Sequence, residues 1–309
     1  MIFTYKWEKL LFTSIISQII PQRKPVNIMI FGKSSIGAST IMKKFIPVKK
    51  FKMTEELTGQ SYMMLTKKVP NELCIIAISD FNSMIKRKKS TSDFFMSKLL
   101  SGTWEGIGSW EQGGKQGYTQ EHAFLPIISK VTTNTWRSIA SDFYDIGLLQ
   151  RLLLVHIDYT EEQWMAIRKY IYNKKNDEIE YTLPSLDNVF VDYDPVESQE
   201  NLMDVASRIA DETSFVTVNR YGKTDIRHIG KNPRYDKMLL SLTMGVAVYN
   251  HIVKNGINEY EKTNVFVNKD DYLETIRLCE LFGSTVKYLG EYEPIDKKFI
   301  YNKGVMAKW

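Results

Sequence analysis

The chain has 309 residues, of which 43% are hydrophobic and 25% charged, a composition typical of a globular protein with a sizeable core. The net charge of +5 permits a nucleic-acid partner without requiring one. Two cysteines, Cys74 and Cys279, lie inside apolar runs and favour a reduced, cytoplasmic protein over a disulfide-rich one; the four histidines show no metal-ligand spacing.

Residues 1–25 are expected to form an amphipathic helix, because apolar residues recur with helical spacing between Trp7 and Ile20. The stretch is too short and too interrupted by polar residues to cross a membrane, and it lacks the small-residue cleavage site of a signal peptide. We therefore expect the helix to pack on its own domain or on a neighbouring subunit, with no membrane partner.

The run VNIMIF predicts a buried parallel strand that leads directly into the sequence GKSSIGAST, and TIMKKF then has helical character. The glycine spacing in this context is that of a phosphate-binding loop, whose backbone N–H groups and helix N-terminus favour phosphate. A glycine-containing turn without a ligand is the alternative. The residues expected to contact the nucleotide are Gly32, Lys33, Ser34, Ser35, Gly37, Ala38, Ser39 and Thr40.

Ala38 occupies the loop position that usually holds a lysine. Without that lysine, the loop lacks a charge-assisted contact with the phosphates, which contributes about 1.5–3 kcal/mol. Lys33 could replace part of this contact. Two explanations stay open. Ala38 is natural and the protein is a weak or inactive ATPase, or a lysine was replaced deliberately to block hydrolysis. The intact remainder of the loop favours the second, and the codon in the natural gene decides.

The run LCIIAISDF predicts a second buried strand, which ends at Asp80. In P-loop ATPases an aspartate in this place orders the Mg²⁺ shell beside the hydroxyl of the loop. We therefore expect Ser39 and Asp80 to hold Mg²⁺. An aspartate that only caps the turn after the strand is the alternative.

A basic run leads into an amphipathic helix after this strand, and it consists of Lys86, Arg87, Lys88 and Lys89. A solvated loop is its default interpretation, and contact with a phosphate backbone is the alternative. Further along, the glycine-rich EQGGKQGY predicts a β-hairpin or a long loop. Lys115 can meet a phosphate and Tyr118 can stack on a base, so this loop is either a DNA contact without strong base preference or an ordinary surface hairpin.

The run FLPIISKVTTN predicts a third strand that ends in Thr132, Thr133 and Asn134. These polar groups can hold the attacking water or the γ-phosphate, or they only terminate the strand. The predicted hairpin is expected to project from the core with its base against them. Arg151 then stands between a helical stretch and a fourth strand, LLLVHI, and needs an anionic partner. That partner is either an internal carboxylate or, for an arginine finger, a neighbouring subunit's nucleotide.

Residues 161–200 are polar and linker-like, and they predict a connecting segment between a core over 26–160 and a helical part over 201–309. In the helical part an apolar stripe runs along the sequence YDKMLLSLTMGVAVY. Asn268 is expected to cap a further helix.

The segments GKSSIGAST, IIAISDF, IISKVTTN and GLLQRLLLV, in this order, resemble the additional-strand P-loop ATPases of the AAA+-like kind, nearest to those encoded by phages, viruses and plasmids. The resemblance covers 26–160 well and 200–285 loosely. It implies an α/β fold, with a P-loop NTPase core and mainly parallel sheet followed by a smaller, helical lid-like domain. It also implies ATP and Mg²⁺ as cofactors, and a homo-oligomeric ring, expected to be a hexamer, that works on DNA with a partner protein from the same mobile genetic element.

The same resemblance implies catalytic roles for Asp80, Thr133, Asn134 and Arg151, and a nucleotide contact for Arg234. Phe81 stands where many relatives place the catalytic glutamate. Glu56, with Glu55 as the alternative, is expected to supply the base from a neighbouring strand end. Two other functions stay open: a nucleotide-binding scaffold without turnover, and a non-enzymatic DNA-binding protein. Whether the DNA process is replication, remodelling, packaging or transposition is left open.

Overall fold

The protein is described by a computed structural model, which describes residues 6–21, 24–32, 36–85, 89–105, 108–112, 115–120, 124–133, 135–136, 143–157, 159–172, 180–213, 215–218, 224–227 and 232–291. Among the described helices, none combines the length and the apolar character needed to span a membrane. Both cysteines are buried and free.

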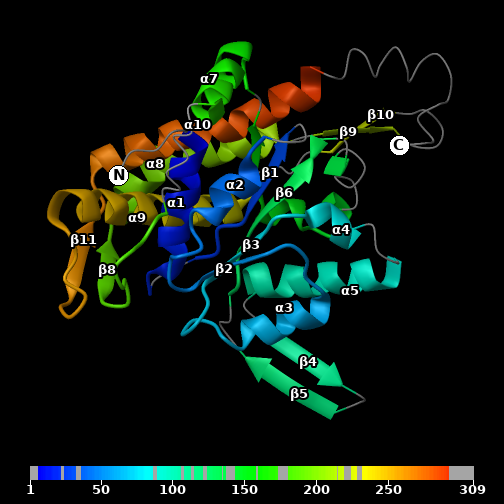
Figure 1. Cartoon of the computed structure of the whole chain (residues 1–309), viewed down its shortest axis with the longest axis horizontal. Coiled ribbons are helices and arrows are strands. Elements are labelled where there is room, and N and C mark those ends of the chain that lie inside the picture. Colours follow the sequence, from blue (N-terminus) through cyan, green and yellow to red (C-terminus); the bar gives the residue numbers. More distant parts are fainter. Residues whose placement is uncertain are drawn as a thin grey trace.

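A five-stranded sheet forms the centre of the molecule (Figure 1). Every neighbouring pair in it is parallel. Most of its residues are apolar and buried, which is typical of strands covered on both faces. The expected α/β class and parallel sheet are thereby confirmed. In spatial order the strands are β2 (Phe51–Thr54), β3 (Ile75–Ile78), β6 (Ile127–Thr132), β1 (Ile28–Gly32) and β7 (Leu153–Ile157).

The strand order places β6 between β1 and β3, although both precede it in the chain. Gly32 at the end of β1 lies opposite Thr132 of β6 and Ile157 of β7. We call the side of the sheet where the five strands end the carboxyl edge, and the side where they begin the amino edge. The connection from β1 to β2 crosses the sheet in the opposite direction to the later ones, so the carboxyl edge contains a topological switch point, the usual place for a ligand in such sheets.

Helices cover the sheet on both sides (Figure 1). One group consists of α1 (Lys6–Ile19), α8 (Pro195–Glu212), α9 (Pro233–Asn255) and α10 (Lys269–Glu291). On the other side α3 (Gly59–Thr66) packs against α5 (Lys89–Leu100). The remaining helical elements are the short α2 (Ala38–Lys43), α4 (Phe81–Ile85), η1 (Ser101–Glu105) and η2 (Leu149–Arg151), and the longer α7 (Glu161–Tyr172), which projects from the body (Figure 1).

Three further strand pairs lie outside the central sheet. They are the antiparallel hairpin of β4 (Gly108–Gln112) and β5 (Lys115–Gln120), the parallel pair of β8 (Val189–Asp192) and β11 (Thr263–Phe266), and the antiparallel pair of β9 (Phe215–Val218) and β10 (Thr224–Arg227). The hairpin was predicted. The strands β8, β9, β10 and β11, each four residues long, were not.

The helix α1 is buried on nearly all sides, although the sequence predicted an amphipathic helix. Its buried carboxylate has partners within the chain: Glu8 forms an ion pair with Lys44 at 2.9 Å and accepts a hydrogen bond from the Tyr181 hydroxyl at 2.8 Å. Gly245 of α9 allows the close approach, since an added Cβ there would lie 2.2 Å from the carbonyl oxygen of Thr13. Packing on its own chain, one of the two expected arrangements, is therefore observed.

One continuous hydrophobic core extends from Trp7 to Phe282. The apolar stripe predicted on α9 is buried in it, from Tyr235 to Tyr249. Since α10 packs on β7 and α9 packs on α1, the helices expected to form a separate lid share this core with the sheet. The boundary expected at 161–200 therefore does not divide the molecule into two cores.

Candidate functional site

The glycine-rich loop leaves β1 at the carboxyl edge. A Cβ added to Gly32 would lie 2.5 Å from the carbonyl oxygen of Ile157, so only glycine lets this strand end approach β7 so closely. Gly37 has φ = +75°, a backbone conformation that residues other than glycine adopt only with strain. The helix α2 begins directly after it at Ala38, which is fully buried, while Ser39 is half-buried. Residues 33–35, which include Lys33, lie outside the described residues.

Tyr159, which sequence reasoning missed, holds the loop from the side of β7. Its hydroxyl donates a 3.0 Å hydrogen bond to the carbonyl oxygen of Ile36. Its ring meets Trp164 of α7 edge-on, with ring centroids 5.3 Å apart. The available signal was its position just after a strand that ends at the same edge as the loop.

Asp80 is exposed and lies two residues beyond the end of β3. One of its carboxylate oxygens accepts a 3.1 Å hydrogen bond from the backbone N–H of Asn82, so the capping role weighed for this aspartate is present. One strand, β6, separates β3 from β1, which places their ends about 10 Å apart. Within the described residues no cluster of three or more His, Cys, Asp or Glu side chains could hold a metal by itself. A magnesium ion held by Ser39 and Asp80 would therefore need phosphate oxygens or water as further ligands.

Within the described part of the chain, three buried polar atoms that follow the ends of β3 and β6 have no hydrogen-bond partner. They are Oγ1 of Thr133, Oδ1 of Asn82 and Nε1 of Trp136. Thr133 is only 6% exposed, whereas the hydroxyl of the preceding Thr132 is bonded to that of Thr135 at 2.9 Å. Buried polar groups are nearly always paired, and an unpaired one costs about 1–3 kcal/mol. Because these atoms lie near the switch point, a bound ligand or water could supply the hydrogen bonds that they lack. Asn134 lies outside the described residues.

Phe81 faces the core, with its ring packed between those of Phe95 and Phe143 at centroid distances of 6.1 and 5.8 Å. A glutamate in this position would point away from the carboxyl edge. Glu56 follows β2 at that edge and is exposed, and its carbonyl accepts a 2.8 Å hydrogen bond from the Thr54 hydroxyl. Three strand spacings separate β2 from β1, about 14 Å, so a base role for Glu56 requires a ligand that extends well beyond the loop.

Two arginines expected near a nucleotide lie at the amino edge instead. Arg151 lies two residues before the start of β7, is 8% exposed, and donates a 2.6 Å hydrogen bond to the carbonyl oxygen of Gly147. Arg234 donates to the side chain of Gln150 at 3.3 Å and stacks on Trp104. The whole length of the sheet separates both from Gly32.

Arg234 therefore lies at the opposite edge from the loop of its own chain, and its contact with a nucleotide stays a prediction. An amino-edge position is compatible with contact to another subunit. A finger must extend from its own chain, however, and the Arg151 guanidinium is folded onto its own backbone. The finger role is therefore not part of the proposed function.

The expected DNA-binding residues are described only in part. The backbone of the hairpin is described, with Lys115 opposite Gln112 and Tyr118 opposite Trp110. The hairpin leads into the amino end of β6, where the N–H of Leu125 donates to the carbonyl oxygen of Gly102 at 2.9 Å. Its base therefore does not touch Thr133, contrary to expectation, because β6 lies between them. Residues 86–88 lie outside the described residues, and Lys89 begins α5.

The chain matches no protein-family model and no curated protein sequence.

Proposed function

We propose that the chain binds ATP with Mg²⁺ at the carboxyl edge of its sheet and acts as a subunit of an AAA+-like ATPase that works on DNA. The observation that carries this proposal is the strand order. It brings the glycine loop after β1, Asp80 after β3 and the unpaired Thr133 hydroxyl after β6 to one edge of one parallel sheet. An additional strand between the loop strand and the aspartate strand is the arrangement that the resemblance implies.

Each group has a stated task in this proposal. The loop from Gly32 to Ala38 binds the phosphates through backbone N–H groups, and Tyr159 fixes its shape through the carbonyl of Ile36. Thr133 donates its hydroxyl to a phosphate oxygen or to the attacking water. Ser39 and Asp80 hold the Mg²⁺, which when bound neutralises charge on the phosphates.

Ala38 sets the expected activity. Without an ammonium in the loop, the protein binds ATP weakly and turns it over slowly or not at all. A nucleotide-binding scaffold without turnover is the second candidate function, favoured by Ala38 together with the buried Phe81.

The test compares the chain with Ala38→Lys and Ala38→Met variants in titrations with labelled ATP and Mg²⁺. Methionine reproduces the long side chain at the same buried position without its charge. We expect Ala38→Lys to bind about 10- to 100-fold more tightly than Ala38→Met, since a charge-assisted contact contributes about 1.5–3 kcal/mol. A folded Ala38→Lys protein that binds no ATP contradicts the proposal. Binding without hydrolysis selects the scaffold.

A further inference from the structure

We propose that the surface formed by the end of α2, the strand β2 and the helix α3 binds the backbone of single-stranded nucleic acid. We call this surface the lysine groove. It comprises Lys43, Lys49 and Lys52 together with the open groove between β2 and α3. The inference rests on the proposed action on DNA and assigns that action a contact surface other than the hairpin.

The charge of this segment is strongly unbalanced. Residues 43–68 contain seven lysines and two glutamates, a surplus of five that equals the net charge of the whole chain, +5. Three of these lysines form ion pairs: Lys44 with Glu8, Lys50 with Asp187, and Lys68 with Glu72.

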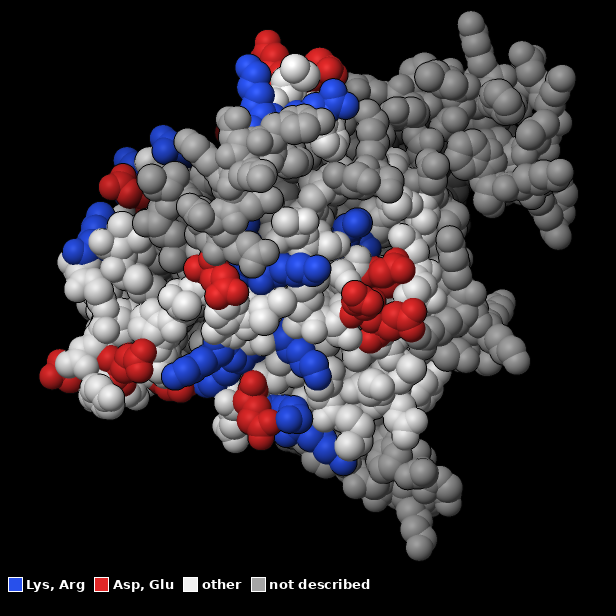
Figure 2. Space-filling model, in the orientation of Figure 1, with Lys and Arg blue, Asp and Glu red and all other residues white. Residues whose placement is uncertain are grey.

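Lys43, Lys49 and Lys52 are exposed, and no ion pair is found for any of them among the described residues. Figure 2 shows Lys and Arg side chains over this part of the surface, with some Asp and Glu side chains among them and a further group of Asp and Glu beside them. A polyanion on this surface would therefore meet lysines for which no ion pair is found among the described residues, although Lys49 lies near enough to Asp187 to help lower the pKa of that carboxyl.

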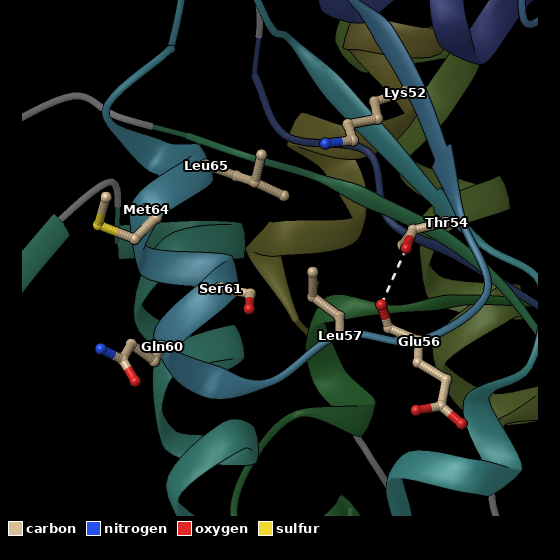
Figure 3. A pocket seen from close by; sticks show the side chains of 8 residues that line it. All are labelled: Lys52, Thr54, Glu56, Leu57, Gln60, Ser61, Met64 and Leu65. Carbon is tan, nitrogen blue, oxygen red and sulfur yellow. Dashed lines mark hydrogen bonds between the residues drawn. The ribbon is translucent and has the colours of Figure 1, made fainter.

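The groove supplies the groups that contact a nucleic-acid backbone. It has a volume of about 610 Å³ and opens along β2, one of the two outermost strands of the sheet (Figure 3). Lys52, Gln60 and Ser61 offer an ammonium, an amide and a hydroxyl, which are common partners of phosphate oxygens. Leu57 and Met64, the latter 50% exposed, offer apolar contact for sugars or bases. Glu56 also borders the groove, but Figure 3 shows its carboxylate turned away from Lys52.

The arrangement favours a nucleic acid over an acidic peptide. The three lysines belong to three successive segments, the end of α2, the turn before β2 and β2 itself, so their charge is distributed over several segments and not gathered in the groove alone. Distributed charge suits a ligand whose own charge repeats along its length. The hairpin strand β4 packs against α3, the helix that forms the second wall of the groove. A lysine on a short edge strand also discourages strand pairing between molecules, which accounts for Lys52 but not for Lys43 or Lys49.

The experiment measures binding of a fluorescent oligothymidylate by anisotropy, over a salt series and without nucleotide. The groove variant carries Lys43→Gln, Lys49→Gln and Lys52→Gln. The matched control carries the same charge change on α9 and α10, as Lys237→Gln, Lys254→Gln and Lys269→Gln. A third variant, with arginine in place of each of the three groove lysines, keeps the positive charges. It shows whether binding depends on the charge or on the lysine side chain itself.

We expect the groove variant to bind at least tenfold more weakly in low salt. The slope of log affinity against log salt should fall by about 2, because each phosphate that a lysine neutralises adds about 0.7 to the slope for a single strand. The control and the arginine triple should match the unmodified protein. Equal affinity and slope in the groove variant and the control would overturn the inference, as would no DNA binding by the unmodified protein. Displacement of the oligonucleotide by polyglutamate at equal charge concentration would also overturn it, in favour of an acidic protein partner.

ATP titrations on the same samples keep the two proposals separate. DNA binding that depends on the groove, with no ATP binding by the Ala38→Lys protein, contradicts the ATPase alone. ATP binding with no effect of the groove variant contradicts only the lysine groove.

Discussion

Replacing Thr133 by valine is expected to stabilise the protein and to weaken its nucleotide site. Valine has nearly the same shape as threonine but lacks the hydroxyl. That hydroxyl is buried, 6% exposed, and finds no hydrogen-bond partner among the residues that the structure describes. Removing an unpaired buried polar group recovers part of its desolvation cost of about 1–3 kcal/mol. The free energy of unfolding should therefore rise by about 1 kcal/mol.

Thr132 provides the matched control one residue earlier. Its hydroxyl bonds to that of Thr135 at 2.9 Å and also accepts from the backbone N–H of Thr135 at 3.3 Å. Thr132→Val makes the same chemical change but breaks these bonds, so it should lower the free energy of unfolding by about 0.5–1.5 kcal/mol. Urea unfolding of both variants, followed by circular dichroism, measures the two shifts, which we expect to have opposite signs.

Ligand binding supplies the second half of the test. If Thr133 donates to a phosphate oxygen, Thr133→Val in the Ala38→Lys background should weaken ATP binding or slow hydrolysis about 10- to 100-fold, because a hydrogen bond to a charged group contributes about 1.5–3 kcal/mol. A Thr133→Val protein that is less stable than the parent, with unchanged ATP binding and turnover, would refute the reasoning that this hydroxyl waits for a ligand.

Three further changes test the packing and the loop. Gly245→Ala places a Cβ 2.2 Å from the carbonyl oxygen of Thr13, whereas ordinary contacts begin near 3.4 Å, so α1 and α9 must move apart. Urea unfolding should show that the free energy of unfolding falls by about 1–3 kcal/mol. Burial raises the pKa of the Cys279 thiol to about 12, so at pH 8 this thiol should react with maleimide only as fast as the protein opens. Urea should accelerate the reaction. Rapid labelling of the native protein would instead place this thiol at the surface. Tyr159→Phe removes the 3.0 Å hydrogen bond to Ile36 while keeping the ring, and ATP titration of the Ala38→Lys protein should show about fivefold weaker binding.

Features that depend on neighbouring residues in the chain could be predicted from the sequence. Strands β1, β3, β6 and β7 are apolar runs bounded by polar residues, and all four were predicted. The buried stripe of α9 follows from helical spacing. Asn268 caps α10 as expected, with its side-chain oxygen accepting from the N–H groups of Asp270 and Asp271. The glycine loop could be predicted because its backbone conformation at Gly37 requires a particular residue type at that position.

The meeting of distant segments was decided by the tertiary structure. The burial of α1 depends on a gap at Gly245, more than two hundred residues away, and its spacing of apolar residues resembles that of a surface helix. The sharing of one core by the sheet and the C-terminal helices likewise has no local signal. A polar connecting segment looks the same whether it joins two domains or two parts of one.

The candidate site shows the same division. The sequence by itself determined the glycine loop, the aspartate after a strand and the threonines after another, since each depends on a strand and the residues that end it. Only the order of the strands decided that these groups share one edge, and that Arg151 and Arg234 lie at the opposite one. Strand order is fixed by crossover connections and by the packing of helices on both faces, and these interactions act between residues far apart in the chain.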